Sequence, residues 1–461
     1  MYTKNRLVNA PDLFLTLLLI CWILILLAIP VIGYLGETWT SVLSFFVDDG
    51  WCQPPKQGLG IHCFGDFGFP YQHAINGTAY STGSLGAANT PLSIFLFELL
   101  SQAHYNVALI FVQILMIAGF VGTVYWGSLA RNIHTRLMLV LLVGVGSVGS
   151  IVAIDRSNWV GFLAPLILLF VVFIDKRLWI RASVVLVLIA GLKFWGIVFV
   201  VGLIAKKQFK YALLCFVLTP LSYLFFFAAA ERNKSLFEKM RLTFEAITDK
   251  EYSSLVSKYG VSIYSGLVRI NCSYQDAGGC DFNRPSAYLD HSMAIAMICA
   301  AILALWACAS MIYFARNRFL AYTPLISLGF LAVPDAPAYN LVFALPAVAL
   351  LFRWLSADLD RVIRVRGGTK QATLEYRLTV CLMATLIFSV VPIPLWSFGE
   401  NNDSMLGYWR LSNLIVPSVW IIVVVFYLFV MLKGVLSPHD KPHSIDDLLF
   451  VEGISSRIQE V

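Results

Sequence analysis

Charged residues are scarce in this chain. Asp, Glu, Lys and Arg make up 13% of the 461 residues, whereas 59% are hydrophobic, and the mean hydropathy is +0.77. A soluble domain has roughly 25% charged and about 45–50% apolar residues, so this composition excludes one. The basic loops contain no glycine-rich phosphate loop, and no His-Glu-x-x-His or Cys-x-x-Cys pair occurs in the chain. A nucleotide is therefore not an expected ligand.

Long apolar runs predict an all-α polytopic membrane protein. The first run starts at Asp12 and continues past Ile32, which is long for the core of a signal peptide, and no small-residue cleavage site follows. We therefore expect a first helix that stays in the membrane. Spans are predicted at 12–34, 104–127, 137–153, 159–174, 210–229, 291–315, 319–333, 339–355, 377–396 and 413–432.

The apolar run over 182–205 needs separate treatment, because basic residues flank both of its ends. At a rise of about 1.5 Å per residue it is too short for two full crossings. We expect two half-helices with Lys193 at a buried turn, since broken helices are tolerated where they line a protein or water cavity. A single long span is the alternative. With this hairpin counted as two, the chain has about 12 crossings.

Loop charge orients the chain in the plasma membrane. Of the 33 Lys and Arg residues, 21 lie in segments on the side of the termini, and eight of the other 12 lie in one long loop, 230–290. Long loops count little in the positive-inside rule, so both termini are expected in the cytoplasm. Residues 1–436 would form one transmembrane domain with outer loops 35–103 and 230–290, followed by a polar tail over 437–461. The cations form no single patch, so nucleic acid is not an expected partner.

The nine cysteines fit this topology. Five lie in predicted spans, where a free thiol is a small apolar filler. The others are Cys52 and Cys63 in the first outer loop and Cys272 and Cys280 in the second. Pairs confined to one face suggest two local disulfides in an oxidising compartment, and a zinc site made of the four thiolates is the alternative.

The polar stretch 52–91, which follows the first span, holds the main candidate for chemistry. Asp66 would act there as a general base, and a solvated loop carboxylate or a helix cap is the alternative. Asp48 and Asp49 compete for the same role. In the second outer loop, the apolar spacing over 236–256 predicts an amphipathic helix that lies on the membrane surface.

Two cations on the outer face are candidates for holding a phosphate. Arg156 lies in a short turn between two spans, and its planar guanidinium suits a phosphate, although a salt bridge with Asp155 is the alternative. Lys193 lies deep in an apolar run, where a charge defaults to a functional hypothesis, and snorkelling to the interface is the alternative. Asp335 and Asn340 mark a further proline-rich outer turn.

The order of these motifs resembles that of glycosyltransferase family 87, within the GT-C superfamily of polyprenyl-phosphate-sugar transferases. The resemblance covers roughly residues 12–355 and rests on Asp66-Phe67 with Tyr71, Thr90-Pro91-Leu92, Arg156-Ser157-Asn158, Gly191-Leu192-Lys193-Phe194, and Ser262 to Arg269. The chain departs from the pattern at Gly260-Val261, where the family has Asn-Gln, and at Tyr339-Asn340, where it has a His-Tyr pair. The cysteine-containing first loop is similar to that of an actinobacterial branch.

The resemblance implies a GT-C-like bundle that transfers a sugar, with mannose expected, from a polyprenyl-phosphate donor to a lipid or glycan acceptor at the outer face, with inversion. It implies that Asp66 takes the acceptor proton and that neither a cofactor nor a metal is needed. Arg156, Lys193 and Arg269 would hold the donor phosphate, and Tyr71, His73, Asn158, Asp335 and Asn340 would contact the substrates. A multi-pass transporter or lipid flippase of the cell envelope is the alternative, because it also needs a polar cavity and broken helices.

Overall fold

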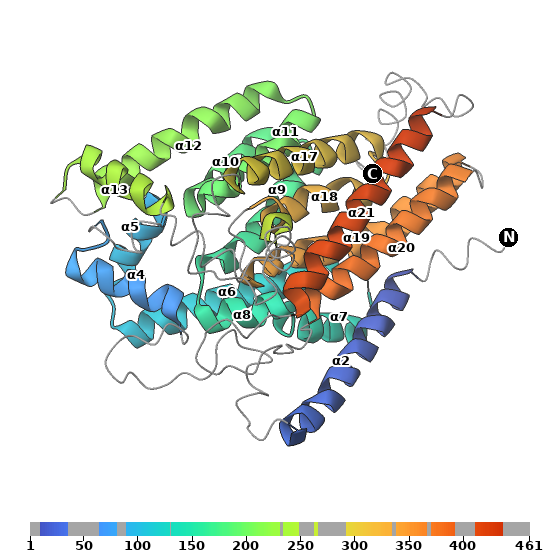
Figure 1. Ribbon diagram of the computed structural model, residues 1–461, viewed down its shortest axis with the longest axis horizontal. Helices are drawn as coiled ribbons and strands as arrows, with labels where there is room; N and C mark the ends of the chain where they lie inside the picture. Colours follow the sequence, from blue (N-terminus) through green and yellow to red (C-terminus); the bar gives the residue numbers. More distant parts are fainter. Residues whose placement is uncertain are drawn as a thin grey trace, which may run out of the picture.

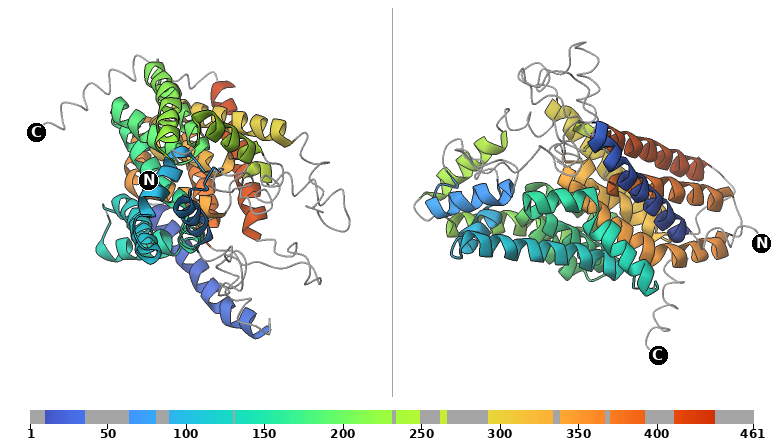
Figure 2. Two further views of the ribbon diagram at one scale, coloured as in Figure 1. Left: turned by 90° about the vertical axis from the view of Figure 1, so that its left-hand side faces the viewer. Right: turned by 90° about the horizontal axis from the view of Figure 1, so that it is seen from below.

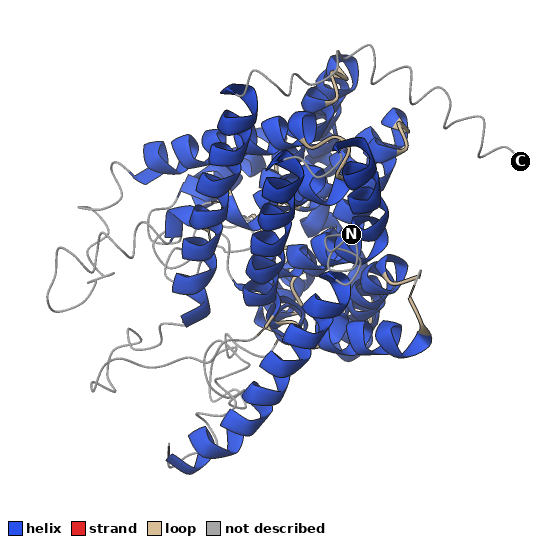
Figure 3. Ribbon diagram, turned by 90° about the vertical axis from the view of Figure 1, so that its right-hand side faces the viewer, coloured by secondary structure: helices blue, strands red, loops and turns tan. Residues whose placement is uncertain are grey.

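Every regular element in the described part of the computed structural model is helical (Figures 1 and 3), as the sequence predicts. The described residues are 10–35, 64–80, 89–129, 131–230, 234–248, 262–265, 292–333, 338–366, 370–391 and 411–436. The predicted roles of Asp48, Asp49, Cys52, Cys63, Arg269, Cys272, Cys280 and Asp335 and the predicted tail fall outside these ranges and stay predictions.

The N-terminal half of the bundle contains two long helices, α2 and α6, and otherwise short helices with frequent breaks. Its elements are α2 (Ala10–Leu35), α4 (Gly65–Asn76), α5 (Pro91–Leu100), α6 (Tyr105–Gly127), α7 (Ile133–Leu139), the π-helix η2 (Val140–Val145), α8 (Val148–Arg156), the 3₁₀ helix η3 (Trp159–Phe162), α9 (Leu163–Asp175) and α10 (Trp179–Leu192). The helix α2 lies at the periphery, against α19, α20 and η2 (Figure 2).

The C-terminal half contains most of the long helices and the deeply buried helix α18. Its elements are η4 (Phe194–Val200), α11 (Val201–Ala205), α12 (Phe209–Ala229), α13 (Leu236–Thr248), α17 (Ser292–Tyr313), α18 (Arg318–Leu331), η5 (Ala338–Phe343), α19 (Ala344–Arg366), α20 (Lys370–Val390) and α21 (Leu411–Leu436). All residues from 319 to 331 of α18 are buried, so this helix lies at the centre of the core.

Several described helices have the length and composition of membrane spans. Four qualify, Tyr105–Gly127, Phe209–Ala229, Thr373–Val390 and Ile415–Lys433. The pair Ile133–Val145 and Val148–Arg156 would be a fifth, although it bends by 52°. In the other helices the apolar stretch whose side chains the structure describes is shorter, as at Pro11–Leu27 in α2 and Met297–Tyr313 in α17. Helix α9, with 13 residues, rises about 20 Å against a hydrocarbon core of about 30 Å. By length, the described helices account for four or five of the 12 predicted crossings.

The bent pair owes its close packing to glycine. A Cβ on Gly149 of α8 would lie 2.2 Å from the backbone nitrogen of Val342 in η5, so these two backbones touch.

Gly144, Gly146 and Gly149 have the G-x-G-x-x-G spacing of a dinucleotide-binding loop. They follow helix α7 and not a strand, so the structural context of that fingerprint is absent here.

The helix break expected near Lys193 is present. Helix α10 ends at Leu192, Lys193 is extended (φ −145°, ψ 126°), and η4 begins at the next residue. A helix that stops inside an apolar bundle leaves carbonyl groups that need other donors. Tyr223 Oη donates to the carbonyl oxygen of Ala190 at 2.6 Å, from the neighbouring helix α12.

A second set of donors for the end of α10 comes from the N-terminus of α5. Thr90 Oγ1 and Ser93 Oγ lie 3.2 Å and 3.1 Å from the carbonyl oxygen of Leu192. Thr90 also caps α5, accepting from the backbone N–H of Ser93, and Pro91 occupies the first helical position. The Thr-Pro pair thus starts one helix and supports the end of another.

Helices α4, α5 and α13 gather at one end of the bundle, beside the C-terminus of α12 (Figure 1). The helix predicted over 236–256 is present as α13 over Leu236–Thr248; residues 249–256 lie outside the described ranges, and its location on a membrane surface stays a prediction. On one face it buries Lys239, whose Nζ donates to the carbonyl oxygens of Phe227 (2.7 Å) and Ala230 at the end of α12. The opposite face exposes Phe237 and Phe244, as expected for a helix at a membrane interface.

Candidate functional site: an aspartate held by arginine and asparagine

Helix α4 brings Asp66 to the end of α8. Phe64, just before α4, has a left-handed backbone (φ 59°), and its N–H donates to the carbonyl oxygen of Asp155 at 2.9 Å. Such a conformation is uncommon for a bulky residue and persists only where the surrounding structure enforces it. This backbone contact sets the first turn of α4, and therefore Asp66, against the C-terminus of α8.

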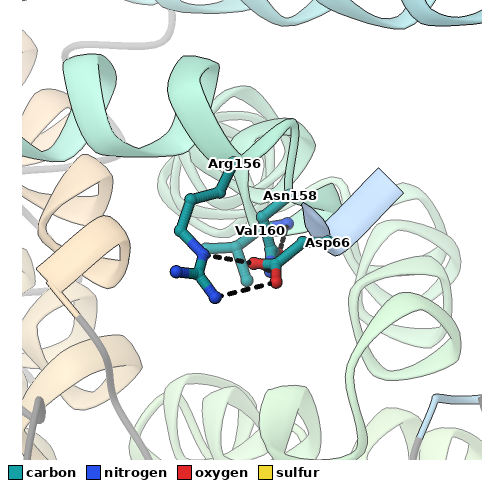
Figure 4. Close-up of polar contacts among 4 residues, drawn as sticks. All are labelled: Asp66, Arg156, Asn158 and Val160. Atoms are coloured by element: carbon teal, nitrogen blue, oxygen red, sulfur yellow. Dashed lines mark hydrogen bonds and ion pairs between the residues drawn. The ribbon is translucent and has the colours of Figure 1, made fainter. Parts of the chain in front are cut away.

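The C-terminus of α8 places two functional side chains two residues apart. Ser157 is left-handed (φ 49°), and the N–H of Asn158 donates to the carbonyl oxygen of Ala153 at 3.2 Å, which is the pattern of a left-handed helix end. Arg156 is the last residue of the helix, and Asn158 follows the reversal. Both side chains point toward Asp66 (Figure 4).

Arg156 contacts both carboxylate oxygens of Asp66. Its Nε lies 3.1 Å from Oδ2 and its Nη2 lies 3.1 Å from Oδ1, as a guanidinium fork does when it binds a carboxylate through two parallel hydrogen bonds. The Asp66 and Arg156 side chains are 22% and 19% exposed. The pair is therefore partly desolvated, and loss of either partner would leave a poorly hydrated charge.

Asn158 adds a third hydrogen bond to the same carboxylate. Its Nδ2 donates to Oδ2 of Asp66 at 2.6 Å, while its Oδ1 accepts from the backbone N–H of Val160 at 2.9 Å. Because the N–H of Val160 can only donate, it fixes which end of the amide is oxygen and turns the NH₂ group toward Asp66. A carboxylate has about four acceptor positions, and the described residues fill three of them.

The sequence predicts that these three residues lie on the same face of the membrane, but it predicts a separate role for each. The structure joins them: the predicted base contacts a predicted phosphate ligand and a predicted substrate ligand. The sequence offered Asp155 as the salt-bridge partner of Arg156, whereas the structure shows a bidentate pair with Asp66. The direct contacts of Asn158 are with Asp66 and with its own turn, so it orients the carboxylate.

Tyr71 and His73, also predicted to contact substrate, lie on α4 and have partners within the protein. Tyr71 is buried, packs against Phe67 and Tyr105 at ring-centroid distances of 5.4 Å and 5.2 Å, and donates its hydroxyl to the carbonyl oxygen of Ala103 at 2.6 Å. His73 Nδ1 lies 2.9 Å from Thr78 Oγ1 and joins the end of α4 to the turn that follows. Substrate contact by either residue stays a prediction.

Two other predicted residues, Lys193 and Asn340, lie outside the contacts of Asp66. Lys193 occupies the break between α10 and η4 and is not among the described side chains that contact Asp66. Asn340 is 1% exposed and lies on η5, the element that touches α8. Its Oδ1 has no hydrogen-bond partner among the described residues.

Sequence reasoning missed one residue that supports the site. Gln113 Nε2 of α6 donates to Ser157 Oγ at 3.3 Å and so contacts the turn between Arg156 and Asn158. An amide in the middle of an apolar run was the available signal, since such a group needs a partner away from water. Within the described part of the chain, no three His, Cys, Asp or Glu side chains lie close enough to hold one metal ion.

Comparisons with protein-family models, with curated proteins and with solved structures find no match to this chain. The described part of the chain defines a helical protein with several membrane-type spans.

Proposed function

We propose that the chain is a membrane glycosyltransferase that moves a sugar, with mannose expected, from a polyprenyl-phosphate donor to a lipid or glycan acceptor at the outer face. The observation that carries this proposal is the bidentate pair between Asp66 and Arg156. The resemblance of the motif order to glycosyltransferase family 87 supports it, and so does the break at Lys193.

The pair supplies both functions that such a transfer needs. A guanidinium fork binds a phosphate as well as a carboxylate, so a donor phosphate would compete with Asp66 for Arg156. With Arg156 turned to the donor, Asp66 becomes available to the acceptor hydroxyl. Donor binding would therefore precede, and permit, activation of the acceptor.

With Asp66 as the base, the contacts favour one of its oxygens as the proton acceptor. When Arg156 leaves, Oδ2 of Asp66 keeps its hydrogen bond from Asn158, and Oδ1 loses its described partner. The acceptor oxygen would attack the anomeric carbon while its proton passes to Oδ1. The bond between that carbon and the phosphate oxygen breaks on the opposite side, and its electron pair leaves with the polyprenyl phosphate, so the configuration inverts.

The test is transfer of labelled mannose from polyprenyl-phosphate mannose in membranes that contain each variant. Asp66→Asn keeps the shape of the side chain but cannot take the proton, so turnover should fall about 10²-fold or more. Donor binding should be as tight as in the wild type or tighter, because a neutral Asn competes less for Arg156. Arg156→Lys keeps the charge without the fork and should weaken donor binding.

Asp48→Asn and Asp49→Asn are the matched controls, because they remove a carboxylate from the same outer loop. If one of them abolishes transfer while Asp66→Asn retains it, the base is misassigned. If the wild-type protein consumes none of a panel of polyprenyl-linked sugars, the enzyme class is wrong and the transporter alternative gains.

A further inference from the structure

Two turns of the bundle share one unusual backbone conformation. Arg177, after α9, and Lys207, after α11, have φ values of 58° and 57°. In each turn the following residue closes the helix end: the N–H of Leu178 donates to Phe173 O at 2.8 Å, and the N–H of Gln208 donates to Leu203 O at 2.9 Å. Glycine is the favoured residue at such a position, so both turns keep a cation where the backbone disfavours any side chain.

The two turns meet around Tyr322 of α18. Tyr322 Oη lies 3.4 Å from Asp175 Oδ1 at the end of α9. Lys206 Nζ, in the other turn, lies 5.5 Å from the centroid of the same tyrosine ring. Tyr322, 147 positions away from Asp175 in the chain, thus contacts both turns. We call residues 175–181 and 205–210 together the basic double turn.

The basic double turn has a strong excess of positive charge. Its acidic residue, Asp175, is paired with Arg318 of α18 at 3.3 Å. The exposed cations of the double turn are Lys176, Arg177, Arg181, Lys207 and Lys210. By sequence, these two stretches therefore contain five exposed cations and a single acidic residue.

An exposed apolar surface begins directly at these cations. Ile180 on α10 is 65% exposed, and Phe209 and Leu213 on α12 are 62% and 64% exposed. The first turns of α10 and α12 lie side by side, because Cys215 Sγ of α12 contacts the carbonyl oxygen of Ser183 in α10 at 3.8 Å. On both helices, the cations of the basic double turn are therefore followed directly by exposed apolar side chains.

We propose that the basic double turn binds the headgroup of an anionic phospholipid, whose acyl chains lie along the exposed faces of α10 and α12. A phosphodiester with a net negative charge complements the cations, and the apolar face favours a lipid over free phosphate. The positive-inside rule places this site in the cytoplasmic leaflet, away from the Asp66 site.

The experiment is native mass spectrometry of the detergent-purified protein titrated with dioleoyl phosphatidylglycerol or dioleoyl phosphatidylcholine. The wild type should bind the anionic lipid more tightly than the zwitterionic one. The variant Lys176→Gln/Lys207→Gln should lose that preference, because its affinity for the anionic lipid should fall about fivefold for each charge removed. The control variant Arg353→Gln/Lys433→Gln removes two exposed cations from α19 and α21 and should keep it.

A second variant separates lipid binding from folding. Arg177→Gly/Lys207→Gly removes two charges but allows the left-handed turns, so it should fold at least as well as the wild type and still lose the preference. The proposal is overturned if the wild type binds both lipids equally, if either double-turn variant keeps the preference, or if the control loses it. Displacement of the anionic lipid by millimolar inorganic phosphate would overturn the assignment to a lipid.

Discussion

Arg156 contacts both carboxylate oxygens of Asp66 at 3.1 Å, although 90 positions separate them in the chain. The first turn of α4 and the last turn of α8 are thereby joined by an ion pair. Removal of either side chain leaves the other partly buried and without this ion pair, so the pair should show strong coupling.

The first prediction is a thermodynamic cycle on this pair. Asp66→Ala and Arg156→Ala should each lower the free energy of unfolding by about 1–3 kcal/mol, and the double variant should lose less than the sum of the two. Thermal unfolding in detergent, followed by size-exclusion chromatography, measures all three. The exposed pair Arg241–Glu245 on α13 is the control and should couple by only about 0.3–0.5 kcal/mol. Additive losses at Asp66 and Arg156 would contradict the coupling.

The second prediction concerns the contact between α8 and η5. Gly149→Ala places a methyl group 2.2 Å from the backbone nitrogen of Val342, so one backbone must move, and stability should fall by about 1–3 kcal/mol. Since α8 carries Arg156, activity should fall as well. Gly122→Ala on α6 is the control: a Cβ there meets nothing within 4 Å, and the change should be neutral or stabilising by about 0.5–1 kcal/mol. Equal behaviour of the two variants would refute the close contact.

The third prediction concerns the break at Lys193. Tyr223→Phe removes the hydroxyl that donates to Ala190 O and leaves a helix-end carbonyl without that donor. The free energy of unfolding should therefore fall by about 1–3 kcal/mol. Ser222→Ala is the neighbouring control, because the Ser222 hydroxyl donates within its own helix to Thr219 O, and its loss should cost about 0.5 kcal/mol or less. Thermal unfolding should give a lower melting temperature for Tyr223→Phe than for Ser222→Ala. Equal melting temperatures would disprove the role of the hydroxyl.

The local elements of this protein were predictable from the sequence. Apolar runs locate the helices, Thr90-Pro91 marks the start of α5, and the spacing of apolar residues locates α13. Gly191 and Lys193 in an apolar run indicate the end of α10. These features depend on residues within a few positions of each other, because helix formation, capping and amphipathicity are local properties.

The number of full-length spans was harder to predict, because hydropathy measures composition and not where a helix ends. The run over 159–174 is apolar throughout, but its first residues form the separate 3₁₀ helix η3 before the 13 residues of α9. The end of a helix depends on which neighbouring groups can accept or donate at its termini, and those groups come from other elements.

The sequence alone determined that the chain is helical, apolar and rich in candidate polar residues after the first span. Only the tertiary structure decided which of those residues meet. The partner of Arg156 could have been its neighbour Asp155, but the backbone contact of Phe64 with Asp155 and the left-handed turn at Ser157 bring Arg156 and Asn158 to Asp66. A charge pairs with what the packed backbone brings within about 3 Å, and residues 90 positions apart reach that distance only when the helices between them have packed.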